Sequence, residues 1–208
     1  MRFSKLLAII LVFVSSLAVV ASAADYRRIV GLSVGAGVSS AMGDLADANR
    51  YDCKLGAPRL TLAIEVYPVR RFSIGGYLGV DNFGSRTVVP GFGLLGHEQS
   101  EIAKVDLSNL RVFDFGVTGR FFFRTGSAMQ PFLRMWFGVS CLLATASGET
   151  YSSHTANGWG CGPGLMYLLN RHFGFTGELM YNNTRTGETV RENTSRINLG
   201  VWMNLLIG

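Results

Sequence analysis

The chain is poor in charged residues and especially in lysine. Asp, Glu, Lys and Arg make up 16% of its 208 residues, and lysine occurs three times. A water-exposed surface usually carries about 25–35% of these residues, so this chain has too few charges to cover itself in water. Beyond residue 23 it also lacks any apolar run of about 18 residues or more, which excludes a membrane-spanning helix from that part of the sequence.

The excess of positive charge is also small. The first 23 residues contain two of the 19 Lys and Arg and none of the 14 Asp and Glu, which leaves 17 basic against 14 acidic side chains and a net charge of +3. Domains that bind nucleic acid are usually far more basic, with Lys and Arg clustered on one face. The composition therefore argues against nucleic acid as a partner.

Residues 1–23 have the pattern of a secretory signal peptide. Two basic residues precede an apolar run over 6–20, and Ala21-Ser22-Ala23 supplies a cleavage site with small residues. An uncleaved membrane anchor is the weaker alternative, because two serines interrupt the run and it is shorter than the roughly 20 residues of a spanning helix. We expect residues 1–23 to be removed and residues 24–208 to form one domain, since no linker divides them.

Apolar and polar residues alternate along much of the remaining chain, as they do in strands with two unlike faces. In the last segment, Ile197, Leu199 and Val201 alternate with Asn198 and Gly200. The same pattern predicts eight strands, over 29–39, 59–67, 72–81, 111–123, 131–143, 158–168, 173–181 and 196–208. The protein is therefore predicted to be all-β.

The connections between these strands alternate in length. Those after the second, fourth and sixth strands are short, at 68–71, 124–130 and 169–172, whereas the other four are long. Short turns at one end and long loops at the other are typical of an up-and-down barrel that crosses a membrane.

The two strand faces differ in a way that indicates which one meets lipid. One is continuously apolar, and the other consists of Gly, Ser and Thr with the bulky Tyr77, Trp136 and Trp202 and no lysine. A soluble, lipocalin-like barrel would expose this second face to water. Inside a narrow eight-stranded barrel, small residues leave room for large ones. The glycine-rich stretches 35–37 and 160–164 are therefore interpreted as inward-facing wall and not as nucleotide loops.

Aromatic residues on the apolar face gather towards the strand ends. The group near the short turns consists of Phe72, Phe121, Phe123, Tyr167 and Phe173. The group towards the long loops consists of Phe113, Trp159 and Tyr181. Two such groups are expected for the aromatic girdles of a membrane barrel. Core aromatics at the strand ends of a soluble protein are the alternative.

The whole mature chain resembles the small eight-stranded outer-membrane β-barrels of the OmpA and OmpX type. The signal peptide, the eight alternating segments and the rhythm of connections carry the resemblance, together with the closing strand. There Asn198, Gly200, Met203 and Leu205 have the spacing of the family's terminal assembly signal, although the chain ends in Leu-Ile-Gly and not on an aromatic residue.

This resemblance implies an all-β, transmembrane, eight-stranded antiparallel up-and-down β-barrel in the bacterial outer membrane. It also implies contact with outer-membrane lipid, the barrel assembly machinery as a partner during biogenesis, and long extracellular loops that present a surface to an external ligand.

Seven charged residues fall on the face predicted to point inward: Glu65, Asp81, Asp114, Arg120, Arg134, Glu178 and Arg196. Buried charges must find partners, and the interior of an eight-stranded barrel is filled by side chains. We therefore expect an ion-pair network that fills the lumen and has a structural, not a catalytic, role.

One stretch offers residues for nucleophilic chemistry, because His154 follows Ser152 and Ser153. Lipid A deacylases are eight-stranded barrels that use a Ser-His pair with an acid, and in that family the pair forms a His-x-Ser motif on the barrel wall. No His-x-Ser occurs here, so the protein is expected not to be an enzyme.

The first long loop contains three acidic residues, Asp44, Asp47 and Asp52. Their spacing is not that of a calcium-binding loop, and solvated loop carboxylates are the simpler interpretation. The sequence therefore predicts no metal site and no cofactor.

Cys141 and Cys161 lie on the apolar face of neighbouring predicted strands, on either side of the loop 144–157. An exported protein meets conditions that allow a disulfide between them. Cross-strand disulfides have demanding geometry, however, and free apolar cysteines are common. Both alternatives stay open, and Cys53 is the odd cysteine.

These features favour an integral outer-membrane barrel with a structural or surface-interaction role, in which the long loops form the contact surface. A narrow pore or a carrier for small hydrophobic molecules is the second alternative, and a lipid A-modifying hydrolase is the third.

Overall fold

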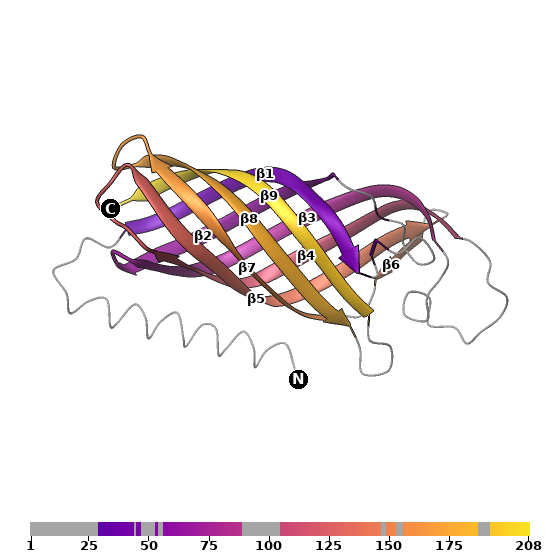
Figure 1. Ribbon diagram of the computed structural model, residues 1–208. Helices are drawn as coiled ribbons and strands as arrows, with labels where there is room; N and C mark the ends of the chain where they lie inside the picture. Colours follow the sequence, from indigo (N-terminus) through magenta and orange to yellow (C-terminus); the bar gives the residue numbers. More distant parts are fainter. Residues whose placement is uncertain are drawn as a thin grey trace.

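The computed structural model describes residues 29–43, 45–46, 53, 56–88, 105–146, 149–152, 156–186 and 192–208. Their strands are β1 (Ile29–Gly43), β2 (Ala57–Val69), β3 (Phe72–Val88), β4 (Val105–Phe122), β5 (Met129–Ala146), β6 (Glu149–Ser152), β7 (Ala156–Leu168), β8 (Phe173–Thr186) and β9 (Glu192–Ile207). Eight of these strands close into a barrel, and the short β6 pairs only with β5 (Figure 1). Among the described residues, no helix is long and apolar enough to span a membrane.

Each barrel strand runs antiparallel to its two neighbours. The strands follow one another around the barrel in sequence order, and the β1–β9 and β4–β5 pairings complete the ring. The β1–β9 ladder extends from Val30 opposite Ile207 to Gly43 opposite Thr194. A closed sheet can stand in lipid because its backbone donors and acceptors are paired between strands. The predicted all-β, eight-stranded antiparallel barrel is confirmed.

The connections divide between the two ends of the barrel. The segments 70–71, 123–128 and 169–172 join strands at one end, termed the turn end, where β9 also finishes (Figure 1). The segments 44–56, 89–104, 147–155 and 187–191 join strands at the opposite end, termed the loop end.

At the loop end the strands extend beyond their predicted bounds. β3 continues to Val88 where the pattern ended at 81, β4 begins at Val105 in place of 111, and β9 begins at Glu192 in place of 196. Alternation marks only the part of a strand whose outer face is continuously apolar, whereas backbone pairing continues beyond that part. The sequence pattern did not predict β6.

The two faces of the wall are as predicted. Along β9, Leu199, Val201 and Met203 are 57%, 61% and 54% exposed, whereas Trp202 and Asn204 are 1% and 0% exposed. An outward apolar stripe around a polar interior is the arrangement of a transmembrane barrel. The soluble alternative, with the apolar stripe inside, is wrong.

Candidate functional site

The lumen holds all seven charged side chains that the alternation directed inward, and each is 6% exposed or less. With an eighth residue, Arg59, they form two groups of two arginines and two carboxylates. Among the described residues, no ion pair joins one group to the other. The turn-side group consists of Glu65, Arg120, Arg134 and Glu178, and the loop-side group consists of Arg59, Asp81, Asp114 and Arg196. Each group is formally neutral.

The turn-side group is a chain of alternating charges across the barrel. Arg134 on β5 lies with Nη1 2.8 Å from Oε2 of Glu178 and with Nη2 3.3 Å from Oε1 of Glu65. The same Glu65 oxygen lies 3.1 Å from Nε of Arg120. The group therefore joins β2, β4, β5 and β8, which supply one residue each.

Neutral polar side chains on other strands form hydrogen bonds to this group. Arg120 donates from Nη1 to Oδ1 of Asn204 at 3.3 Å and from Nη2 to Oγ of Ser33 at 3.2 Å. The Ser33 hydroxyl donates in turn to Asn204 at 2.7 Å, and the Ser73 hydroxyl donates to Oε2 of Glu65 at 3.3 Å. These contacts bring β1, β3 and β9 into the same layer of the lumen.

The loop-side group is a closed ring of four charges. Asp81 accepts from Arg59 at 2.5 Å and from Arg196 at 2.6 Å, and Asp114 lies 3.2 Å from Arg59 and 2.8 Å from Arg196. The Ser140 hydroxyl also donates to Oδ1 of Asp114 at 2.5 Å. Each arginine thus contacts both carboxylates.

Arg59 was absent from the seven residues predicted from the sequence. It stands at the first position of the predicted segment 59–67, on the same face as Thr61 and Glu65, so the alternation was sufficient to find it. A second signal was the charge count, because three arginines against four carboxylates left one negative charge unmatched in the interior.

Aromatic side chains lie between the two groups. Tyr77 stacks on Trp136 with ring centroids 5.6 Å apart and lies 6.2 Å from the ring of Trp202. The Arg134 guanidinium lies 4.2 Å from the centroid of Trp202, and Arg59 donates from Nη2 to the Tyr77 hydroxyl. A cation above an aromatic face is attracted by the ring quadrupole, so this layer contacts the charges on both sides of it.

Glycines in the wall make space for these large rings. A Cβ built on Gly35 would lie 2.7 Å from the Trp202 ring, and one on Gly160 would lie 2.2 Å from Nε1 of Trp136. The stretches 35–37 and 160–164 therefore lie in strands and face the lumen with close approaches, as predicted.

Apolar residues occupy the lumen beyond each charged group. At the turn end, Phe122, Phe132 and Met166 form a buried cluster with Tyr67 and Leu168 packed against it. At the loop end, the inward positions hold buried apolar side chains, namely Ala41, Ala57, Phe83, Leu110, Val112, Leu142 and Ala156. The charges thus lie between an apolar cluster at the turn end and a largely apolar layer at the loop end, where Thr184 and Thr194 are also buried.

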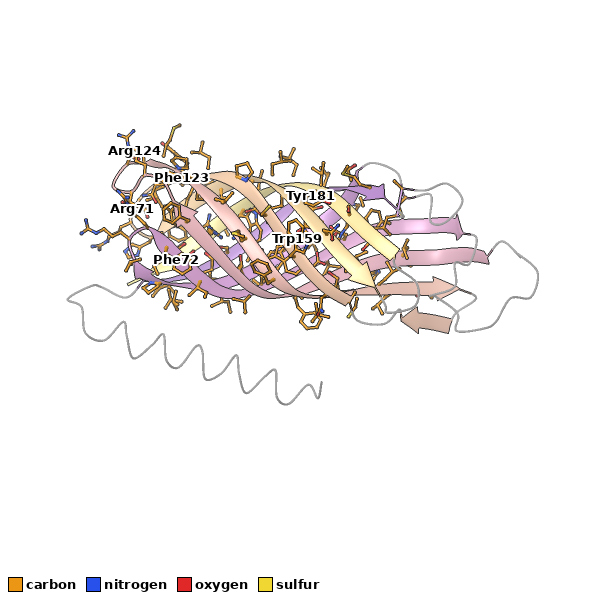
Figure 2. All side chains as sticks on the ribbon, turned by 60° about the horizontal axis from the view of Figure 1, so that its bottom comes forward. Arg71, Phe72, Phe123, Arg124, Trp159 and Tyr181 are labelled. Atoms are coloured by element: carbon orange, nitrogen blue, oxygen red, sulfur yellow. The ribbon has the colours of Figure 1, made fainter. Side chains whose placement is uncertain are left out.

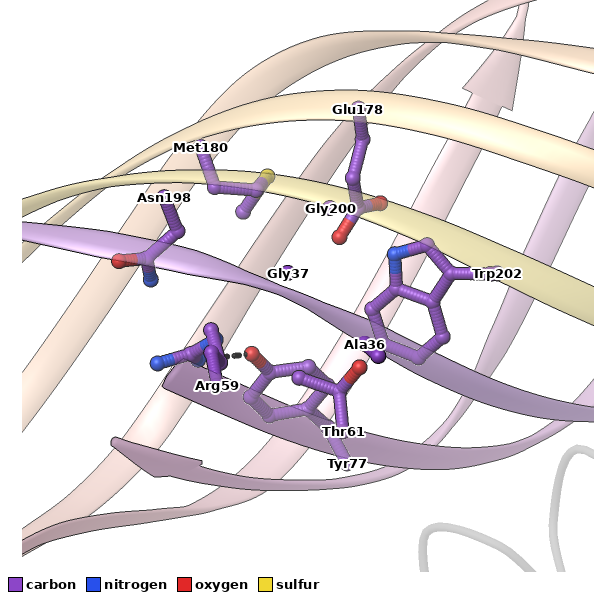
Figure 3. Close-up of a pocket in the computed structure, with 10 residues that line it drawn as sticks. All are labelled: Ala36, Gly37, Arg59, Thr61, Tyr77, Glu178, Met180, Asn198, Gly200 and Trp202. Carbon is purple, nitrogen blue, oxygen red and sulfur yellow. Dashed lines mark hydrogen bonds between the residues drawn. The ribbon is translucent and has the colours of Figure 1, made fainter. Parts of the chain in front are cut away.

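One small cavity lies in the lumen near the aromatic layer. Its lining includes Arg59, Tyr77, Glu178, Asn198 and Trp202 (Figure 3). Its volume of ≈ 10 Å³ is enough for about one water molecule. Beside the aromatic layer, side chains therefore leave room for about one water molecule and no wider passage in this cavity.

The disulfide alternative for Cys141 and Cys161 is wrong. Both thiols are free, and Cys161 on β7 is opposite Met135 on β5. Cys141 stands further along β5 than Met135 by six residues, about 20 Å of strand, whereas a disulfide needs Cα atoms within about 7 Å. The sequence placed both residues on the apolar face but gave no measure of the register between their strands.

The remaining sequence candidates lie outside the described residues, namely Asp44, Asp47, Asp52 and His154. Ser152 belongs to β6, and Ser153 is also outside the described residues. His172 in the turn end is described: its Nδ1 lies 3.1 Å from the Leu206 carbonyl, and Arg171 contacts its Nε2 at 2.9 Å. Within the described residues, no group of three or more His, Cys, Asp or Glu could hold a metal ion.

Aromatic rings lie on the outer wall near both ends of its apolar band. Phe72 and Phe123 stand close to the turn end, and Trp159 and Tyr181 stand further towards the loop end (Figure 2). Phe123 pairs with Phe121 at a centroid distance of 5.6 Å, and Trp159 pairs with Tyr181 at 5.7 Å. Paired rings at two levels are the pattern of interfacial girdles.

The spacing between these levels fits a bilayer. On β8, Tyr181 marks the level towards the loop end and Phe173 marks the level at the turn end. On the neighbouring β9, Tyr181 is opposite Ile197 and Phe173 is opposite Leu205. The strand from Ile197 to Leu205 is about 27 Å long, which at a tilt of about 40° covers about 21 Å of the membrane normal, close to the apolar band of about 25 Å in such barrels.

Comparisons with known proteins agree with this geometry. The family model for the outer membrane protein beta-barrel domain matches residues 9–201. No curated protein matches the chain significantly. Among solved structures, Neisserial surface protein A has a TM-score of 0.57 at 13% identity, with 86% of this chain and 99% of that chain covered. The attachment invasion locus protein Ail of Yersinia pestis has a TM-score of 0.51 at 11% identity, with 86% and 100% covered. The chain belongs to the outer membrane protein β-barrel domain family and is a protein of the bacterial outer membrane.

Proposed function

We propose that this protein is a non-enzymatic, non-conducting barrel that holds its loops at the cell surface as a contact surface. The filled lumen is the observation that carries the proposal. Two neutral groups of buried charges, an aromatic layer between them and largely apolar layers beyond them occupy the described lumen, and the cavity beside the aromatic layer has room for about one water molecule.

The charged groups suit a structural role. Each takes residues from four strands, and its ion pairs join positions up to 115 residues apart, as for Arg196 and Asp81. Removing one partner of a buried pair leaves an uncompensated charge and costs about 3–5 kcal/mol. Such groups therefore fix one arrangement of the strands, whereas a pore would need charges that line a hydrated path.

The loop end is the proposed contact surface. The strands there extend past the apolar band, and β6 widens the β5 side. One barrel of similar fold, Ail, has been crystallised with the heparin analogue sucrose octasulfate, at a TM-score of 0.50 and 11% identity to this chain. This complex supports the proposal that a barrel of this fold can bind an external ligand.

The biogenesis that we propose follows from the sequence. Residues 1–23 direct export and are removed, and the closing strand with Asn198, Gly200, Met203 and Leu205 is recognised by the barrel assembly machinery. In the structure this strand pairs with both β1 and β8, so it is the element that closes the sheet.

The test combines conductance with surface binding. Purified protein in planar bilayers should give no channel steps. Cells that carry the intact chain should bind heparin-coated or host-cell surfaces more than cells in which residues 90–103 are replaced by a short Gly-Ser linker, while both proteins remain heat-modifiable on gels. Channel steps from the intact chain would replace the proposal by a pore, and equal binding with and without this loop would remove the contact role from it. Altered lipid A masses on expression would instead indicate a hydrolase.

A further inference from the structure

Four arginines lie at the turn end of the barrel. Arg70 and Arg71 form the β2–β3 turn, Arg124 lies in the β4–β5 turn and Arg171 lies in the β7–β8 turn, and all four are exposed. Arg71 and Arg124 project from this end of the barrel in Figure 2. The turn rim, defined as the described segments 70–71, 123–128 and 169–172, contains no Asp or Glu.

Backbone hydrogen bonds join the three turns to neighbouring strands. The Phe122 amide donates to the Arg71 carbonyl at 2.8 Å, and the Leu168 amide donates to the Ala128 carbonyl at 2.8 Å. The Leu206 amide donates to the His172 carbonyl at 2.7 Å. The arginines therefore project from a closed, hydrogen-bonded rim and not from independent loops.

Each turn of the rim adjoins an aromatic residue of the lipid-facing wall. Arg71 precedes Phe72, Arg124 follows Phe123, and Arg171 stands two residues before Phe173. Phe123 is 58% exposed and Phe173 is 45% exposed on the outer face. Girdle aromatics lie at the boundary between hydrocarbon and headgroups, so guanidinium groups one or two residues further out reach the headgroup level.

The other described charged side chains lie elsewhere on the barrel. The eight charged residues of the lumen are neutral in sum, and Arg111, on the outer face of β4 towards the loop end, is the other exposed and described charged side chain. The turn rim is thus a concentrated positive charge beside an apolar band.

We propose that the turn rim binds the phosphate groups of anionic glycerophospholipids in the membrane leaflet that faces the turns. Guanidinium groups bind phosphate oxygens through paired, charge-assisted hydrogen bonds. Each basic residue near an anionic membrane surface contributes about 1 kcal/mol of attraction, which corresponds to about a five-fold preference. A lipid fits better than a free anion, because the acyl chains would contact the adjoining phenylalanines.

The test measures which lipids the barrel retains. Wild-type protein is reconstituted in nanodiscs of equimolar phosphatidylglycerol and phosphatidylcholine, and native mass spectrometry records the lipids that stay bound after release. We expect phosphatidylglycerol to be retained over phosphatidylcholine by at least about five-fold. Combined replacement of Arg70, Arg71, Arg124 and Arg171 by Gln should remove this preference, and replacement by Lys should keep most of it.

Arg111→Gln is the matched control, because it removes an exposed arginine from the other end and should leave the preference unchanged. A heat-dependent gel shift establishes that each variant has folded. An unchanged preference in the fourfold Gln variant would overturn the proposal. The proposal would also be overturned if inorganic phosphate, added at the same concentration as the lipid, bound the wild-type protein and abolished its lipid preference. The site would then be one for a free anion. Capture of wild-type protein by purified peptidoglycan without any lipid preference would assign the rim to a different polyanion.

Discussion

Arg134 is the side chain whose loss should disturb the lumen most directly. It is 0% exposed, contacts Glu178 at 2.8 Å and Glu65 at 3.3 Å, and lies 4.2 Å from the Trp202 ring centroid. Arg134→Met keeps much of the side-chain length but leaves the turn-side group with one cation for two carboxylates. Because Glu65 retains Arg120 at 3.1 Å, the uncompensated charge falls on Glu178. The expected loss in free energy of unfolding is about 3–5 kcal/mol.

A double-mutant cycle separates this charge effect from lost packing. Glu178→Gln alone should cost less, about 1–3 kcal/mol, since Arg134 retains Glu65. The double variant Arg134→Met with Glu178→Gln is neutral again, so its cost should be smaller than the sum of the single costs by about 0.5–3 kcal/mol. Urea titrations of the protein in zwitterionic lipid vesicles, followed by tryptophan fluorescence, measure all three.

Arg111→Met is the control for this cycle, because it removes an exposed arginine and should change stability by no more than about 0.5 kcal/mol. Strictly additive costs, or an Arg134→Met variant as stable as the wild type, would refute the reasoning. Either result would mean that water screens the charges of the lumen, and a hydrated path would then be expected in conductance measurements.

Three further predictions concern packing, depth and closure. Gly160→Ala places a Cβ 2.2 Å from Trp136 Nε1 and should lower stability by about 1–3 kcal/mol, whereas Gly177→Ala, with no atom within 4 Å, should be neutral or stabilising in the same urea titration. Val201→Arg, midway between the girdle levels, should lower the free energy of unfolding in vesicles by about 2–4 kcal/mol. Ile207→Arg, near the turn end, should lower it by about 0–1 kcal/mol. Equal costs would contradict the placement of the bilayer. The closed barrel should migrate differently in detergent gels before and after boiling, and identical migration would contradict closure.

The sequence by itself determined the strands, their faces and the two ends of the barrel. A wall with lipid on one side and packed polar side chains on the other imposes a period of two, and a one-residue error would exchange the faces. For this reason the inward positions of Trp136 and Glu65 could be read directly. The strand ends at the loop end could not, because outside the apolar band nothing enforces the alternation, and β3 therefore continues to Val88 without a sequence signal.

The tertiary structure alone decided which of these residues meet. Alternation reports the face on which a side chain lies but not its height, and height depends on the register of strands distant in sequence. That register places Arg196 against Asp81 and Asp114, divides the charges into two neutral groups, and keeps Cys161 opposite Met135 and away from Cys141. Closure of the barrel sets all these registers together, and for that physical reason the contacts in the lumen are a property of the whole ring and not of any one strand.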